Sequence, residues 1–170
     1  MAIIGEYDPK KDLGSTVRFL ASILEKTDAF VRHIDAQVNI LVGLSSAIFL
    51  LSVREVDLSD LSSLTLVIFS GLAVIIALFA VHPPKFMRKQ HQSESLFYNK
   101  KITSFPNAQD YADAVNKLVG DSDAIVREYS GEIYNSYKYY YRPKRKLFVW
   151  SRNSLLLGVI LSYLLLFLGF

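Results

Sequence analysis

The chain contains no cysteine, which excludes a disulfide scaffold and any thiolate metal site. It also lacks a Gly-rich phosphate loop, a nucleophile elbow and an H-E-x-x-H sequence. Its histidines, His33, His82 and His91, do not have the spacing of metal ligands. No segment shows strand-like alternation, and no internal repeat is present. We therefore expect a protein that is not an enzyme and that holds no metal or other cofactor.

Long apolar sequence, by contrast, is abundant. Residues 36–53, 61–82 and 153–170 contain no Asp, Glu, Lys or Arg. A hydrocarbon core about 30 Å thick is crossed by about 20 apolar residues of helix, with about 17 as the lower limit. Burying three such helices within 170 residues would leave too little polar chain to cover them. These three stretches predict an all-α integral membrane protein. The N-terminus has neither the basic start nor the apolar core of a cleavable signal, so we expect the first span to be retained.

The distribution of charge predicts the orientation. The link between the first two spans, residues 54–60, carries one base and three acids, whereas bases follow the second span and precede the third. Short loops rich in Lys and Arg stay cytoplasmic. We expect a multi-pass membrane protein with a cytoplasmic N-terminus, a cytoplasmic insert at 83–152 and an external C-terminus. The expected membrane-interface anchors are Asp35, Lys85, Arg142, Lys144, Arg145, Lys146, Trp150 and Arg152.

The polar segments read as helices. After a flexible N-terminus (1–14), Ser15 is expected to cap a helix over 15–35 that continues into the first span. Its heptad stripe consists of Val17, Leu20, Leu24, Thr27, Val31, Ile34, Val38 and Leu41. Within the insert we expect helices over 90–104 and 108–119, the latter capped by Asn107, and a third after the cap Asp121. Arg142-Pro143 is expected to kink or break the helix that leads into the last span.

These elements predict a two-span hairpin, a single C-terminal span and a cytoplasmic helical bundle. The acidic link permits only a tight turn between spans one and two. Small residues such as Gly43 and Ser45 in the first span, and Gly71, Ala73 and Ala77 in the second, favour close helix contact. The N-terminal helix and the insert are both too apolar for solvent, so we expect them to pack on one another.

Aromatic and basic side chains mark a candidate ligand site in the insert. Rings beside cations can stack a base and neutralise a phosphate. The residues we assign to ligand binding are Arg88, Asn99, Arg127, Tyr129, Tyr134 and Tyr137. Packing within the bundle is an equally good explanation of the three tyrosines, and the tyrosines from Tyr139 onward are better explained as an aromatic belt. Asp35, at the entry to the first span, is expected either to face water or to pair with a base such as Lys146 or Arg152.

The order of these segments resembles a known family, the Pycsar-type membrane effectors. These are the transmembrane partners of bacterial pyrimidine nucleotide cyclases in antiphage defence. The likeness covers roughly residues 17–168. The residues that carry it are Asp35-Ala36-Gln37, Val81-His82-Pro83, Leu96-Phe97-Tyr98-Asn99 with Ile102, Asp110-Tyr111, and Arg145-Lys146-Leu147.

The resemblance implies a sensor and a membrane-damaging effector in one chain. A cognate cyclase would supply cyclic UMP or cyclic CMP, and the effector, as a homo-oligomer, would impair the inner membrane and cause abortive infection. The alternative from the sequence alone is a non-enzymatic membrane scaffold whose basic insert binds a partner protein or anionic lipid. Neither reading involves nucleic acid, because the basic residues crowd beside the apolar segments.

Overall fold

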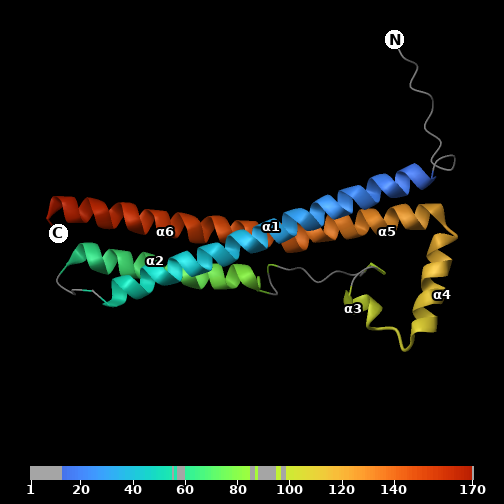
Figure 1. Cartoon of the computed structure of the whole chain (residues 1–170), viewed down its shortest axis with the longest axis horizontal. Coiled ribbons are helices and arrows are strands. Elements are labelled where there is room, and N and C mark those ends of the chain that lie inside the picture. Colours follow the sequence, from blue (N-terminus) through green and yellow to red (C-terminus); the bar gives the residue numbers. More distant parts are fainter. Residues whose placement is uncertain are drawn as a thin grey trace, which may run out of the picture. The chain divides into compact units, whose positions relative to one another are not determined.

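The computed structural model describes residues 13–54, 56, 60–84, 87, 95–96 and 99–169. Every regular element within these residues is a helix. In chain order they are α1 (Leu13–Arg54), α2 (Leu61–Val81), α3 (Asn99–Ile102), α4 (Ala108–Val119), α5 (Ser122–Asn135), the π-helix η1 (Ser136–Tyr141) and α6 (Arg142–Leu168) (Figure 1). The predicted all-helical class is therefore confirmed.

The chain divides into two compact units. The insert unit comprises the described residues of Met1–Ala29 and Gln90–Tyr137, and the apolar unit those of Phe30–Lys89 and Lys138–Phe170. Helix α1 contributes to both units and is unbroken from Leu13 to Arg54. Helix α5, η1 and α6 also follow one another without an intervening loop.

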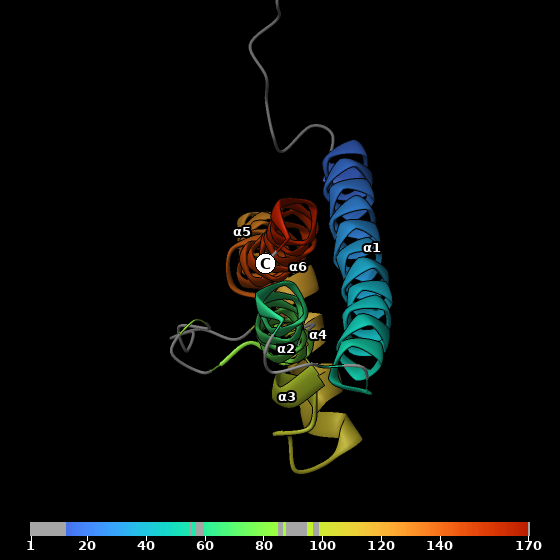
Figure 2. The same cartoon turned by 90° about the vertical axis from the view of Figure 1, so that its left-hand side faces the viewer.

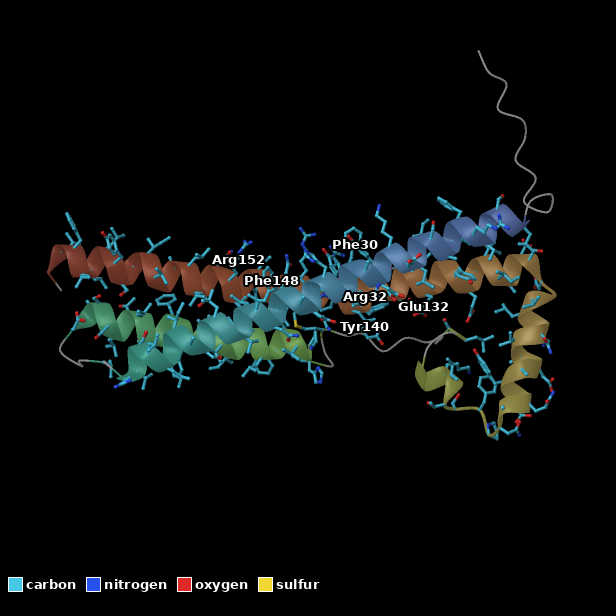
Figure 3. All side chains as sticks on the ribbon, viewed as in Figure 1. Phe30, Arg32, Glu132, Tyr140, Phe148 and Arg152 are labelled. Carbon is cyan, nitrogen blue, oxygen red and sulfur yellow. The ribbon has the colours of Figure 1, made fainter. Side chains whose placement is uncertain are left out.

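Three helices form the apolar unit, in which α2 and α6 lie side by side and the C-terminal part of α1 packs against them (Figures 1 and 2). One core cluster joins Ile34 and Val38 of α1 to Ala80 of α2 and Leu147 of α6. A second cluster repeats this arrangement with Leu41, Ala73 and Leu155. Phe148, labelled in Figure 3, packs against both clusters. Each cluster thus contains at least one residue from each of the three helices.

The contact between α2 and α6 depends on small and hydroxylated residues. Ser151 Oγ donates to the Ala73 carbonyl at 2.7 Å, and Ser62 Oγ donates to the Ser162 carbonyl at 2.9 Å. Both bonds are buried. At Gly158 the two backbones approach so closely that an added Cβ would overlap Phe69 Cβ and lie 3.2 Å from its Cγ. Such side chains allow helices to approach closely where lipid supplies no hydrophobic driving force.

The small residues predicted at the contact between the first two spans are confirmed only in part. Ser45, Ala73 and Ala77 are fully buried. A Cβ at Gly71 would lie 3.0 Å from the Phe49 ring of α1. Gly43, however, has nothing within 4 Å of where its Cβ would be, so it makes no helix contact within the described residues. It lies on the outer side of α1, two residues away from the buried Ser45.

The outer surface of the apolar unit is hydrophobic. Large side chains such as Ile40 (71%), Leu50 (66%) and Phe167 (83%) are mostly exposed. Three helical stretches, lying within Leu13–Arg54, Leu61–Val81 and Ser122–Leu168, are long and apolar enough to cross a membrane. A monomeric soluble protein rarely exposes so large an apolar surface. The protein is therefore a membrane protein, and this surface is the side that faces lipid.

The heptad stripe predicted for α1 is its inward-facing side. Thr27, Ile34, Val38 and Leu41 are buried, and no member of the stripe is exposed. The start of the helix was predicted wrongly, because α1 already includes Leu13 and Gly14, so that Ser15 lies within the first turn rather than at the cap. Because first-turn amides have no intrahelical acceptor in any helix, extending α1 to Leu13 and Gly14 costs little free energy.

The insert unit contains helices α4 and α5 at their predicted positions. Asn107 Oδ1 accepts from the Asp110 amide at 2.9 Å, and Asp121 Oδ1 accepts from the Asp123 and Ala124 amides at 3.0 Å. These are the two caps expected from the sequence. Phe105, in the turn before α4, stacks edge-on against Tyr111 with the ring centroids 5.5 Å apart.

The helix expected over 90–104 is wrong in its extent. Residues 90–94 lie outside the described residues, Ser95 and Leu96 are not helical, and α3 covers only Asn99–Ile102. The Leu96 amide donates instead to Glu128 Oε1 of α5. The Leu96 amide thus bonds to a side chain distant in sequence instead of to a carbonyl within its own helix. This hydrogen bond holds the segment against α5.

Candidate functional site

The predicted ligand residues that the structure describes lie along α5 and the start of η1. Arg127 and Tyr134 are seven residues apart and therefore share a face of α5, whereas Tyr129 lies on the opposite face. Tyr134 and Tyr137 are 53% and 46% exposed, and Tyr129 is half-buried. The side chain of Asn99 and all of Arg88 lie outside the described residues. The arrangement presents one cation and one ring on a common surface.

Arg127 is held only loosely. Its guanidinium lies 3.7 Å from a carboxylate oxygen of Asp121, and the two side chains are 71% and 56% exposed. Exposed pairs of this kind contribute about 0–1 kcal/mol, so an incoming anion can displace the carboxylate. The ligand role of Arg127 and of the other five residues stays a prediction.

The helix leading to the last span has no intervening loop at Arg142-Pro143, where the sequence predicts a kink or a short break. It continues through the π-helix η1 into α6, with Pro143 in the first turn of α6. Proline has no amide donor, and its ring crowds the carbonyl four residues earlier, which here belongs to Tyr139. The i→i+5 bonding of a π-helix widens that turn and moves the carbonyl away. The strain of Pro143 is thus absorbed upstream without breaking the helix.

An ion pair between Asp35 and Lys144 joins α1 to α6 in the apolar unit. Lys144 Nζ lies 2.5 Å from Asp35 Oδ1, and the lysine and aspartate side chains are 16% and 42% exposed. Asp35 therefore pairs with a base, which is one of the two alternatives that the sequence left open. The partner is Lys144 rather than Lys146 or Arg152. Close to this pair the rings of Phe30 and Tyr141 lie 6.3 Å apart.

We predict that the two halves of this pair are unequal. Asp35→Asn leaves a largely buried ammonium without its counter-charge, and should lower the free energy of unfolding by about 1–2 kcal/mol. Lys144→Met should cost less, because Asp35 is exposed enough to be hydrated. Thermal unfolding in detergent measures both. Asp28→Asn, an exposed position on the same helix, is the control and should change nothing. Equal losses at Asp35 and Asp28 would show that the pair does not stabilise the fold.

The predicted anchors occupy the start of α6. Arg142, Arg145 and Lys146 are exposed, and Trp150 is 51% exposed with Lys146 Nζ 4.7 Å from its ring centroid. Arg152 donates to Asn153 Oδ1 at 3.1 Å. Lys85 lies outside the described residues. Lys144 differs from its neighbours because it is turned toward α1.

Sequence reasoning missed the residues that fix α6 against α2. The signal was present, because Ser154, Gly158 and Ser162 recur every four residues and place small side chains on one helix face. We read the third span only for its hydropathy and assigned close contact to the first two spans. The structure shows that the closest backbone approach measured at a glycine is between α2 and α6.

The comparisons with known proteins agree with this architecture. The Pycsar effector protein domain matches residues 19–169, a stretch that takes in the three apolar helices and the α3–α5 insert. Neither a curated protein nor a solved structure matches the chain. Because the match covers nearly the whole chain, the resemblance read from the sequence is confirmed, and the protein belongs to the Pycsar effector family.

Proposed function

We propose that the protein is an antiphage effector that senses a cyclic pyrimidine nucleotide, cUMP or cCMP, and impairs the bacterial inner membrane. Membership of the Pycsar effector family places it in antiphage defence. The insert unit is the proposed sensor and the apolar unit the proposed effector. Damage to the membrane of the infected cell would cause abortive infection.

One observation supports this proposal above the others. Two helical connections, α1 and the α5–η1–α6 succession, run from the insert unit into the apolar unit without a loop. A helix transmits rotation or displacement along its axis, whereas a flexible linker does not. The same chain therefore holds a polar helical unit, a membrane unit and stiff links between them.

The energetic requirement on the ligand is simple. A nucleotide shifts the protein between two arrangements only if it binds one of them more tightly. Moving a population from 1:99 to 99:1 takes a difference of about 10⁴-fold in affinity. A phosphodiester that displaces Asp121 from Arg127, with a base stacked on Tyr134, is a source of such a difference.

Assembly and orientation belong to the same proposal. Three spans cannot line an aqueous pore alone, so several copies are proposed to associate through their lipid-facing helices. The acidic link between α1 and α2 is proposed to be external, and the basic ends of α2 and α6 cytoplasmic. The insert then meets a nucleotide made in the cytosol.

Dye leakage from liposomes tests the proposal. Purified protein reconstituted with its insert outward should release trapped dye when cUMP or cCMP is added, and stay tight with linear UMP or CMP. Arg127→Gln should raise the concentration of nucleotide needed, whereas Lys117→Gln, an exposed cation on α4, should not. If no cyclic pyrimidine nucleotide causes leakage or raises the thermal stability of the protein, the proposal is wrong.

A further inference from the structure

A basic groove of about 680 Å³ runs along one face of the start of α6, within the apolar unit. Four cations line it, Lys138, Arg142, Arg145 and Lys146, and its other walls include Trp150, Val149 and Met87. The α6 residues recur at helical spacing, so they form one continuous strip rather than a scatter of surface charges. Its recorded lining includes none of Arg127, Tyr129, Tyr134 and Tyr137.

Three cations of the groove, Arg142, Arg145 and Lys146, form no recorded ion pair with a carboxylate among the described residues. Of Arg142, Lys144, Arg145 and Lys146, only Lys144 forms an ion pair with a carboxylate among the described residues, and it faces Asp35 of α1. The other two contacts recorded in this run are with rings, since Arg145 lies 6.0 Å from the Tyr141 centroid and Lys146 4.7 Å from that of Trp150. Three positive charges gathered on one helix face, with no carboxylate paired to them among the described residues, favour binding of an anion.

The level of the groove relative to the membrane indicates what kind of anion binds there. The charge-free part of α6 begins at Asn153, and Trp150 precedes it by three residues, or about 4.5 Å along a helix. Lys146 precedes it by about 10 Å. The headgroup region extends about 5–8 Å beyond each face of the hydrocarbon core, and lysine and arginine side chains reach further. Trp150, with its half-exposed ring, is at the level where tryptophans of membrane proteins gather.

We propose that this groove binds the phosphodiester headgroup of an anionic phospholipid. Arg142, Arg145 and Lys146 would neutralise the phosphate, and the acyl chains would lie against Val149, Trp150 and the lipid-facing side of α6. A soluble phosphodiester carries the same charge, but a lipid also satisfies the apolar wall and the proximity to the span. Basic pockets at the cytoplasmic ends of spans bind anionic headgroups in this way. The proposal does not depend on nucleotide sensing.

Trp150 reports on the groove directly, because it is the only tryptophan in the chain. The full-length protein is reconstituted into phosphatidylcholine vesicles that contain a minor share of acyl-brominated phosphatidylglycerol or, in parallel, of acyl-brominated phosphatidylcholine. Bromine quenches the ring when the labelled lipid occupies the groove. Wild-type protein should prefer the anionic lipid at least about fivefold, the effect of roughly one cation in contact.

Two double variants separate a groove from general surface charge. Arg142→Gln with Arg145→Gln removes two lining cations, keeps Lys146 and Trp150, and should lower the preference at least about fivefold. Arg18→Gln with Arg32→Gln removes the same charge from exposed residues of α1 outside the groove (Arg32 is labelled in Figure 3) and should leave the preference intact. Equal loss in both variants, or no preference in the wild type, would overturn the proposal. Displacement of the lipid by free cUMP at concentrations that cause leakage would overturn it too, because the groove would then be a nucleotide site.

Discussion

Replacing Gly158 with alanine is expected to destabilise the apolar unit more than alanine at any other glycine that the structure describes. The new Cβ would overlap Phe69 Cβ, which is the root of a side chain and cannot swing aside. Helices α2 and α6 must then separate, which weakens the hydrogen bonds of Ser151 and Ser62 as well. Overpacking of this kind costs about 1–3 kcal/mol. For a chain of this size the midpoint of thermal unfolding in detergent should fall by about 5–10 °C.

Gly43→Ala is the matched control for this substitution. Gly43 also lies in an apolar helix, but nothing lies within 4 Å of its Cβ position. Alanine is favoured over glycine in a helix by about 0.5–1 kcal/mol, so the midpoint should stay constant or rise. A fall of the same size in both variants would show that detergent-solubilised protein does not pack α2 against α6 through Gly158.

The fold class was predictable because it depends on patterns that act locally. Three charge-free stretches require three apolar helices, and the heptad stripe of α1 identifies the buried Thr27, Ile34, Val38 and Leu41 before any partner is known. Asn107 and Asp121 were predictable as caps because the capped amides lie within three residues of each side chain. Such features need no knowledge of the tertiary structure.

Features that depend on helix register were not predictable in the same way. Lys144, Arg145 and Lys146 are adjacent, and only the rotation of α6 about its axis decides that Lys144 meets Asp35 while the other two line the basic groove. The overlap of Gly158 with Phe69 depends on the same rotation. The π-helix before Pro143 relieves a local clash in a manner that composition does not specify. The insert's missing helical turn at Leu96 follows from an acceptor 32 residues away.

The candidate ligand site was predictable only in part. Its residue types were read from composition, and α5 places Arg127 and Tyr134 on one face as helical spacing requires. Tyr129 falls on the other face, where packing competes with ligand binding as an explanation. The proposed function is therefore supported more by the connection between α5 and α6 than by the ligand residues. That connection is helical throughout.

An insertion of Gly-Ser-Gly-Gly between Tyr137 and Lys138 is expected to abolish nucleotide-induced leakage. This point is the boundary between the two units and lies inside η1, so the insertion replaces a stiff helical link with a flexible one. Glycine in a helix interior costs about 1 kcal/mol per residue relative to alanine, so the inserted segment will not remain helical. Leakage in liposomes should fall to its level without nucleotide, while the nucleotide still raises the thermal stability of the protein. Binding and membrane damage would then be separated.

The same four residues inserted between Pro106 and Asn107 provide the control. This site lies in the turn between α3 and α4, within the insert unit, and it interrupts no helix. Leakage should persist there at the nucleotide concentration that acts on the wild type.

If instead the protein with the insertion after Tyr137 leaks as the wild type does, the α5–η1–α6 connection does not carry the signal. If it abolishes the stabilisation by nucleotide as well, the residues around Tyr137 belong to the binding site, and the link is then tested by moving the insertion to the α1 boundary between Ala29 and Phe30. Loss of leakage with retained binding at either boundary is the result that a rigid helical coupling requires.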